Sequence, residues 1–469
     1  MRWSLPFVLS TLACGPLPMP LPDGGVVEEV PVDARDGGSN DAGGDLDAGS
    51  SVDAGPVADA GQVADAGSPD AQAGLVVYPF NQTHSPLTPA VVAHLRRVAT
   101  REAHDDDVFM KVGDSNTVNT NHLACFSGAN VDLGGRGALQ PALDAFNASR
   151  VAGTSPFARV TLAATVGWSA SAAIAGTPAP LEQELAATNA RFATVMFGTN
   201  DIQAMNLEAY GRTLFTLVDR LLARGVVPLV TSIPPRDDSA AADAQVPWYN
   251  GVTRALAQSR QVPYLDLHRE LLPLPNHGIT TADGLHLNVY LPSGAPRGCL
   301  LTAPGLRYGH NVRNLVTLEG LSRAWGAVTR GTAPDASAPL RLGAGTASGP
   351  LVIDALPFAD VRDTRRDGER LINTYAGCST ANEGGAEVVY RLEVTRAMTV
   401  RATVVSLGAA DLDVHLLQGS VSGAACVARN DKTVTSAVLP GTYFIAVDTY
   451  VSAGAERSGE YALVVMEQP

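Results

Sequence analysis

Apolar and polar positions follow two different patterns along the chain, and the change between them falls after residue 330. Before it, short continuous apolar runs alternate with longer stretches in which apolar positions recur three and four residues apart. Continuous apolar strands between amphipathic helices are typical of a parallel sheet that helices cover on both faces. The pattern therefore predicts an α/β domain over residues 75–330. Its strands are expected at 107–113, 159–167, 192–198, 225–233 and 262–267, and its helices at 206–225, 247–260 and 312–328.

After residue 350 the pattern changes to strands with alternating apolar and polar positions, separated by Gly, Asn and Asp turns. This alternating pattern is typical of an antiparallel β-sandwich. We predict one over residues 351–469, with residues 331–350 as a linker. Asp411, Asp413 and His415 alternate along one of these strands. We interpret them as solvated strand residues, and calcium binding is the alternative.

The first fourteen residues, "MRWSLPFVLSTLAC", combine one early positive charge with an apolar run that is too short to span a bilayer. They resemble a bacterial lipoprotein signal, in which the last cysteine, here Cys14, carries the lipid. The alternative is an ordinary secretory signal that is cut before Asp23. We therefore expect an exported protein that a lipid on Cys14 anchors to a membrane of the cell envelope, or, in the alternative, a secreted one.

Residues 15–74 are predicted to form a disordered tether. Asp-Ala-Gly recurs every six residues from Asp41 to Asp65, and large apolar residues are almost absent, so the segment cannot offset its ordering entropy by burial. Between residues 22 and 74 there are twelve acidic residues and one base, which account for −11 of the net charge of −14. The rest of the chain is close to neutral and has no basic stripe, which argues against a nucleic-acid partner.

The chain has five cysteines, of which four remain if Cys14 carries lipid. An even remainder in an exported protein indicates disulfides. Four cysteines allow three pairings, and pairing within each domain favours Cys125–Cys299 and Cys378–Cys426. None of the cysteines has the spacing of a metal site, and we expect no metal and no organic cofactor.

The stretch "KVGDSNTV" places Ser115 directly after the first expected strand. Ligands of an open parallel sheet bind beyond the carboxyl ends of its strands, so Ser115 is a candidate nucleophile; the alternative is a helix cap. Asp283 precedes His286 by three residues, a spacing that lets the carboxylate orient the imidazole as a base. Gly167 and Asn200 follow two further expected strands and are candidate oxyanion donors together with the N–H of Ser115.

Three blocks, in this order, resemble the SGNH hydrolase family, also called GDSL esterases and lipases: Gly113-Asp114-Ser115, Gly198-Thr199-Asn200-Asp201 and Asp283-Gly284-Leu285-His286. The resemblance covers residues 76–330. It implies a flavodoxin-like three-layer α/β/α fold, with Ser115 as nucleophile, His286 as base and Asp283 as its orienter. It also implies an oxyanion hole of the Ser115 and Gly167 N–H groups and the Asn200 side chain.

Some residues of this region are ambiguous. The family's second block often reads Asn-x-Gly, and Thr165 stands here where the Asn would be, so Gly134, Gly135 and Gly137 are alternatives to Gly167. We interpret Asp201 as a structural residue of its loop. Three further histidines are interpreted as loop or surface residues: His122, His277 and His310.

The C-terminal region resembles the bacterial pre-peptidase C-terminal domain in the stretches "AEVVYRLEVTRAMTVRATV", "ADLDVHLLQG" and "LPGTYFIAVDTY". That family consists of β-sandwich accessory domains of secreted enzymes. No catalytic constellation is visible in this region.

These observations predict an exported serine esterase of the SGNH type. Its substrate would be a small ester or an acylated glycan, such as an O-acetylated polysaccharide or a short acyl ester, and the chain is expected to be a monomer. The alternative is a catalytically quiet cell-surface binding lipoprotein on the same fold. The complete set of Ser115, Asn200, Asp283 and His286 favours the enzyme.

Overall fold

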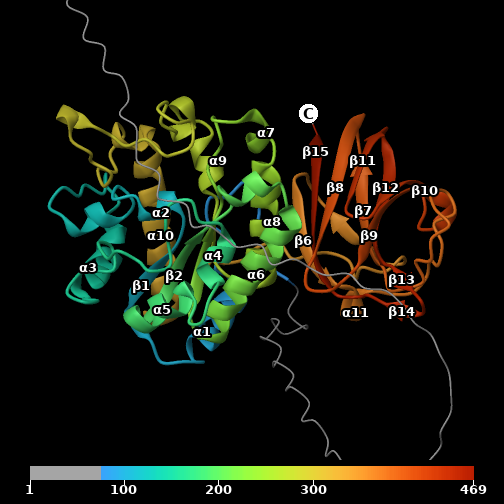
Figure 1. The fold of residues 1–469 in the computed structure, drawn as a ribbon, viewed down its shortest axis with the longest axis horizontal. Helices are drawn as coiled ribbons and strands as arrows, with labels where there is room; N and C mark the ends of the chain where they lie inside the picture. The colour runs from blue at the N-terminus through green and yellow to red at the C-terminus, as the bar shows by residue number, and fades with distance from the viewer. Residues whose placement is uncertain (1–74, 469) are drawn as a thin grey trace, which may run out of the picture. The chain divides into compact units, whose positions relative to one another are not determined.

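The computed structural model describes residues 75–468 (Figure 1). The signal at 1–14, the lipidation site Cys14 and the tether at 15–74 lie outside the described residues. The described residues all belong to one compact unit. Among the described residues, no helix combines the length and the apolar character needed to cross a membrane.

The first region is built on a parallel sheet with the strand order β1-β2-β3-β4. Its strands are β1 (Asp105–Gly113), β2 (Ala190–Met196), β3 (Val227–Thr231) and β4 (Tyr264–Leu265). All residues of β2, β3 and β4 are buried. This burial on both faces is the physical reason for their continuous apolar runs.

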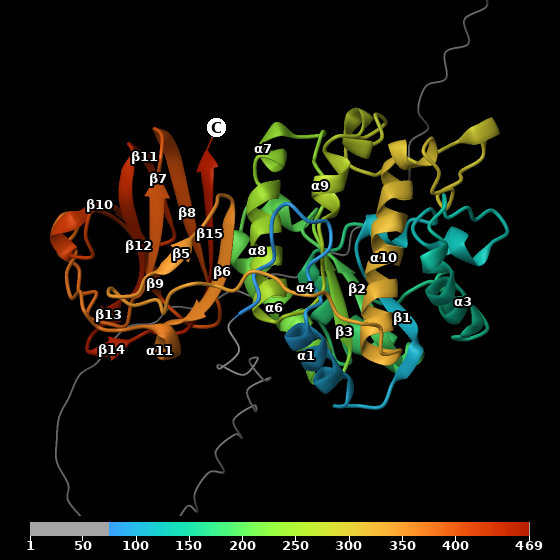
Figure 2. The same cartoon turned by 180° about the vertical axis from the view of Figure 1, so that it is seen from behind.

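Helices cover both faces of this sheet, as the two views in Figures 1 and 2 show. One face carries α1 (Pro89–Ala99), α3 (Gln140–Ala148) and α10 (Gly309–Thr329). The other carries α4 (Ala170–Ile174), α5 (Pro180–Thr188), α6 (Leu207–Ala223) and α8 (Val246–Ser259). Short helices complete the region: α2 (Ser115–Val118), α7 (Ala240–Asp243) and α9 (Leu267–Leu271). The predicted three-layer α/β/α architecture is confirmed.

The strand expected at 159–167 is not formed. The segment runs parallel to the end of β1, but only one bridge, between Gly113 and Ala164, joins them. Val160 and Val166 are 85% and 69% exposed, so half of the apolar pattern faces solvent at the sheet edge. Side chains take the place of the backbone hydrogen bonds that a strand would make here. Thr161 Oγ1 donates to Lys111 O at 2.6 Å, and Glu184 accepts from Leu162 N at 3.0 Å.

The C-terminal region is a sandwich of two sheets, with strand orders β10-β9-β12-β7-β5 and β11-β8-β15-β6. The pairs are antiparallel except β5 with β7, which run parallel. The predicted all-β sandwich is confirmed. The strands of the first sheet are β5 (Leu351–Ile353), β7 (Val388–Val394), β9 (Leu412–Gln418), β10 (Cys426–Asn430) and β12 (Gly441–Thr449). Those of the second are β6 (Phe358–Asp363), β8 (Met398–Ser406), β11 (Thr433–Val438) and β15 (Glu460–Gln468). A small hairpin of β13 (Val451–Ser452) and β14 (Ala455–Glu456) and the helix α11 (Thr364–Asp367) accompany them.

The interpretation of Asp413 and His415 as solvated residues is wrong. Both are buried on β9, with exposed fractions of 4% and 0%. The His415 ring stacks on Tyr375 at 3.5 Å between centroids, and Asp413 pairs with Arg429 at 3.0 Å. The irregular segment between α11 and β7, which carries Tyr375 and Glu383, lies over these residues, and the alternation pattern does not show this contact.

The second sheet of the sandwich packs against α6 and α8 within the compact unit. Gly251 on α8 permits the approach, because a Cβ there would lie 2.7 Å from Val464 Cγ1. Arg260 pairs with Asp219 at 2.7 Å and with Glu460 of β15 at 2.6 Å. The segment expected as a linker also pairs with the start of the described chain, where Val77 N donates to Pro339 O at 2.8 Å.

Candidate active site

Ser115 lies at the carboxyl end of β1, where the chain turns sharply into α2. The Asp114 side chain caps this turn by accepting from Asn116 N at 3.0 Å. Gly113 is required by the close packing, because a Cβ there would lie 2.2 Å from Thr117 Oγ1. Ser115 is thus the first residue of a helix, and its N–H has no partner within that helix.

His286 and Asp283 meet Ser115 from a loop far along the chain. His286 Nε2 lies 2.9 Å from Ser115 Oγ, and His286 Nδ1 lies 2.7 Å from Asp283 Oδ2. The carboxylate therefore holds the proton on Nδ1 and leaves Nε2 to accept the hydroxyl proton of the serine. The structure brings together the three residues that the sequence predicts as a catalytic set.

The charge of Asp283 is fixed by its hydrogen bonds. Its Oδ1 accepts from the backbone N–H groups of Leu285 at 2.9 Å and His286 at 3.0 Å. Partial burial opposes ionisation, but these donors and the imidazole outweigh it and lower the pKa of Asp283. The carboxylate is therefore ionised throughout the neutral range.

The loop that carries this pair is closed on itself. Ile279 bridges Leu287, and Thr280 N donates to His286 O at 2.8 Å. Gly284 stands at the tip with φ of 66° and is pressed against Asp238, so that a Cβ would lie 2.7 Å from Asp238 N. The close packing and the positive φ therefore explain why a glycine occupies position 284.

Asn200 and Gly167 lie next to each other, as the expected oxyanion hole requires. Asn200 Nδ2 donates to Trp168 O at 2.9 Å, which leaves its second N–H available. Gly167 has φ of 80° in an exposed turn, a conformation that favours glycine. Asp201 accepts from Ala170 N at 3.0 Å and so connects this turn to the segment Gly198-Thr199-Asn200-Asp201. This contact agrees with the interpretation of Asp201 as a structural residue.

The alternative glycines lie in a different place. Gly134 packs against Leu301, where a Cβ would come within 2.1 Å of the carbonyl oxygen. Gly135 and Gly137 line a separate groove with Asp132 and Arg136. Only Gly167 among the candidates adjoins the Asn200 contact.

A buried arginine on α10 supports the turn that carries Ser115, and it is not among the residues predicted from the sequence. Arg313 donates to Asn116 O and, at 3.1 Å, to Thr117 Oγ1. Burial lowers its pKa to about 10. Burial likewise raises the pKa of Asp114 to about 6, although the Arg313 charge opposes that rise. In the sequence, Arg313 reads as an ordinary polar position of an amphipathic helix.

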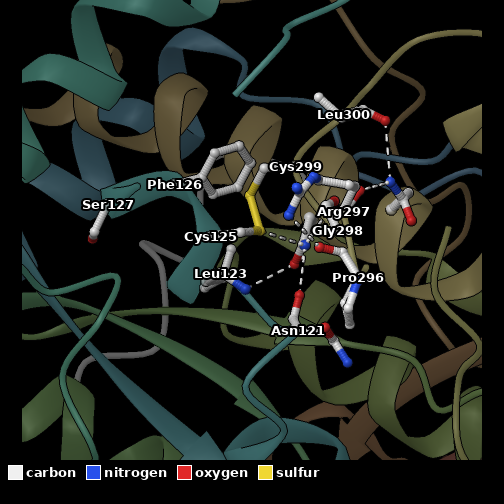
Figure 3. Close-up of a disulfide and its surroundings, with 12 residues drawn as sticks. Asn121, Leu123, Cys125, Phe126, Ser127, Pro296, Arg297, Gly298, Cys299 and Leu300 are labelled. Carbon is white, nitrogen blue, oxygen red and sulfur yellow. Dashed lines mark hydrogen bonds between the residues drawn. A yellow bond between two sulfur atoms is a disulfide. The ribbon is translucent and has the colours of Figure 1, made fainter. Parts of the chain in front are cut away.

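The two predicted disulfides are formed, Cys125–Cys299 and Cys378–Cys426, each with Cα atoms 5.6 Å apart. The first joins the loop after Ser115 to the loop after His286 (Figure 3). Asn314 of α10 reinforces the junction, because its Nδ2 donates to Asn121 O at 2.8 Å and to Gly298 O at 3.0 Å.

Two of the remaining histidines differ from expectation. His122 and His310 are buried, with exposed fractions of 1% and 0%, so the loop-or-surface interpretation is wrong for them. Burial, together with the Arg313 charge, lowers the pKa of both imidazoles. His277 is partly exposed and lies 3.0 Å from Asp237. Within residues 75–468, no group of three His, Cys, Asp or Glu side chains is arranged to hold a metal ion.

Residues 112–290 match the model of the GDSL-like lipase/acylhydrolase family. This part of the chain is similar to GDSL-like lipases and acylhydrolases. The matched residues contain Ser115, Asn200, Asp283 and His286. None of the curated proteins matches the chain.

Solved structures of similar proteins include a GDSL-like lipase from Bacteroides thetaiotaomicron, with 13% identity, coverage of 50% of this chain and 99% of that chain, and a TM-score of 0.29. A two-domain esterase active on acetylated mannans has 14% identity, coverage of 80% and 95%, and a TM-score of 0.31. The pre-peptidase C-terminal domain of a Bacillus anthracis collagenase has 15% identity, coverage of 24% and 89%, and a TM-score of 0.17.

Proposed function

We propose that the GDSL-like domain is a serine ester hydrolase. The observation that carries this proposal is the continuous chain of contacts from Asp283 through His286 to Ser115, with distances of 2.7 and 2.9 Å. Ser115 Oγ attacks the acyl carbon while His286 Nε2 takes its proton. The protonated imidazole, held by Asp283, then gives that proton to the departing alkoxide, which leaves as an alcohol.

The second half of the reaction reverses these roles. His286 takes a proton from water, and the resulting hydroxide attacks the acyl group on Ser115. The carboxylic acid leaves and Ser115 Oγ regains its proton. In both halves the negative oxygen of the tetrahedral intermediate is stabilised by the Ser115 N–H, the Gly167 N–H and the free N–H of Asn200.

The wider proposal concerns substrate and location. A carboxylic ester of modest size is the proposed substrate, either a short acyl ester or an acylated glycan. The chain is proposed to act as an exported monomer, anchored through lipid on Cys14, with residues 1–14 as signal, 15–74 as tether, 75–330 as hydrolase domain, 331–350 as linker and 351–469 as accessory domain. Two disulfides and the order of these segments support export.

A fluorophosphonate probe tests the chemistry. It should label the wild-type protein and fail to label Ser115→Ala, which should also lose p-nitrophenyl acetate hydrolysis by at least about 10³-fold. The catalytically quiet binding protein is the alternative function, and a wild-type chain that neither reacts with the probe nor hydrolyses esters would replace the enzyme with it.

Detergent partitioning tests the location separately. The native protein should enter the detergent phase of a Triton X-114 extraction, and Cys14→Ser should move it to the aqueous phase, because stable anchoring needs more than one acyl chain. A soluble wild-type protein whose N-terminus lies downstream of Cys14 would establish ordinary secretion.

A further inference from the structure

A groove of about 380 Å³ lies beside the catalytic loop, at the start of α10. Its walls come from the segments on either side of the Asp283–His286 loop and from the turn before α10. The lining residues that matter are Asn276, Asn288, Tyr290, Arg307 and Tyr308. None of the residues that line it is an aliphatic Val, Leu, Ile or Met.

Two aromatic rings form the apolar part of this groove. The centroids of Tyr290 and Tyr308 lie 5.3 Å apart, with an angle of 41° between the ring planes. Both tyrosines are only half-buried, so part of each ring faces the groove. Asn311 fixes the backbone of this wall by accepting from Tyr290 N at 3.1 Å.

Polar groups stand around the two rings. The Asn288 amide is anchored inside the wall, since it donates to Ile279 O at 3.2 Å and accepts from Gly309 N at 2.8 Å. Asn276 and Arg307 are exposed on the groove. Asn276 is held in the left-handed region with φ of 49°, a conformation that is sparsely populated and is commonly kept at ligand sites.

The groove and the catalytic base share one piece of backbone. Thr280 N donates to His286 O at 2.8 Å, and Asn288 N donates to Gly278 O at 2.9 Å, so the same closed loop carries both. Tyr290 is four positions after His286, which limits their Cα distance to about 14 Å for a fully extended chain. A ligand of a few rings can therefore contact the tyrosines while its ester lies at Ser115.

We propose that this groove binds a sugar ring of a glycan whose acyl ester is cleaved at Ser115. Sugar rings present apolar C–H faces and a rim of hydroxyls, which match an aromatic surface flanked by an amide and a guanidinium. An acyl chain would need aliphatic walls, which the lining lacks. The inference rests on the proposed esterase function and specifies its substrate as an acylated glycan.

Binding to an inactive protein tests the groove without relying on catalysis. In the Ser115→Ala background, calorimetric titration with β-1,4-linked hexasaccharides of mannose, xylose, glucose and N-acetylglucosamine should detect at least one ligand. Tyr308→Ala should weaken its binding by about 10-fold, as loss of an aromatic anchor does. Asn276→Gly, which suits the left-handed backbone, removes only the amide and serves as a second variant with little risk to folding. Tyr450→Ala, at a half-buried tyrosine of the β-sandwich, is the matched control and should leave the Kd unchanged.

Kinetics with two substrates distinguish this inference from the proposed function. The ratio of kcat/KM for an acetylated oligosaccharide to kcat/KM for p-nitrophenyl acetate should fall by about 10-fold in Tyr308→Ala, mainly through KM for the oligosaccharide. Two results would overturn the glycan groove even if the protein is an active esterase. The first is an unchanged ratio of the two kcat/KM values. The second is binding of all four hexasaccharides with affinities that neither Tyr308→Ala nor Asn276→Gly lowers. If Tyr308→Ala instead raises KM for p-nitrophenyl esters in proportion to acyl chain length, the groove binds acyl chains and the inference is wrong. If the wild-type protein binds a hexasaccharide at the groove but hydrolyses no ester, the proposed esterase function is wrong and the glycan-binding role of the groove is retained.

Discussion

Asp283 and His286 of the α/β region and Asp413 and His415 of the β-sandwich are both closely spaced Asp–His pairs, and their surroundings are opposite. In the α/β region, Asp283 and His286 lie beyond the carboxyl end of β1, where His286 Nε2 is 2.9 Å from Ser115 Oγ. In the β-sandwich, Asp413 and His415 are buried on β9. His415 Nε2 lies 3.9 Å from the nearest carboxylate oxygen of Glu383, too far for a hydrogen bond.

The difference lies in what surrounds each pair. Asp413 is neutralised by Arg429, and burial, with the Arg429 charge adding to it, lowers the pKa of His415 to about 3. That imidazole is neutral in the folded protein and has no nucleophile to serve. Within residues 75–468, Asp283 accepts hydrogen bonds from its own loop and from His286, so its charge is directed at one imidazole. Spacing in sequence alone does not distinguish a catalytic pair from a structural one.

The largest expected effect comes from comparing equivalent substitutions in the two Asp–His pairs. Asp283→Asn should lower kcat by about 10⁴-fold, because the amide favours the wrong imidazole tautomer. Asp413→Asn should leave kcat for p-nitrophenyl acetate within about twofold, since no group of that pair contacts the site. Steady-state kinetics on both variants, with circular dichroism to confirm folding, decide it. Equal losses would remove the catalytic role from Asp283.

Asn200→Ala should have the next largest effect. Loss of one preorganised oxyanion donor should slow kcat by about 10²–10³-fold. KM and the melting temperature should change little, because in the described part of the chain the Asn200 side chain otherwise makes one hydrogen bond, to Trp168 O. A variant that melts much earlier with unchanged kcat per folded molecule would make Asn200 a structural turn residue.

The two disulfides offer a matched pair of variants. Cys125→Ser/Cys299→Ser frees the loops that follow Ser115 and His286, so it should lower kcat by about 10-fold through misplacement of the pair. Cys378→Ser/Cys426→Ser should leave kcat unaffected. Both double variants should lose about 2–5 kcal/mol of unfolding free energy. Chemical denaturation and kinetics on the same samples separate the two quantities, and equal kcat in both variants would contradict the positioning role of the first disulfide.

The smallest expected effect concerns stability against pH in the sandwich. Burial raises the pKa of Glu387 from 4.5 to about 7, although the N–H groups of Leu371 and Ile372 oppose the rise. Because the folded state binds this proton more tightly than the unfolded state, the carboxyl contributes stability below its unfolded pKa. That contribution is lost as the pH rises toward 7.

Glu387→Gln keeps an acceptor for both backbone donors and cannot titrate. Its unfolding free energy should match the wild type near pH 5 and exceed it near pH 7.5. Urea denaturation at the two pH values measures this difference. A constant offset between the two proteins across that range would show that Glu387 does not titrate in the folded state.

The sequence by itself determined the architecture and the candidate catalytic residues. Local periodicity predicts three of the longer helices and four of the five expected strands of the α/β region, because burial of a face leaves a repeat of fixed period. The order of three short blocks was enough to select Ser115, Asn200, Asp283 and His286. Domain membership was enough to select one of the three possible pairings of four cysteines.

Only the tertiary structure decided which polar and edge residues are buried. The segment at 159–167 has the composition of a strand, but Val160 and Val166 face solvent and its backbone bonds to side chains instead. Asp413, His415 and Arg313 have ordinary polar positions in their elements, and their burial depends on segments distant in the chain. The contact of Tyr290 with Tyr308 likewise forms only when the loop after His286 folds back on the start of α10. Such long-range contacts leave no local period, and for this reason a single sequence does not reveal them.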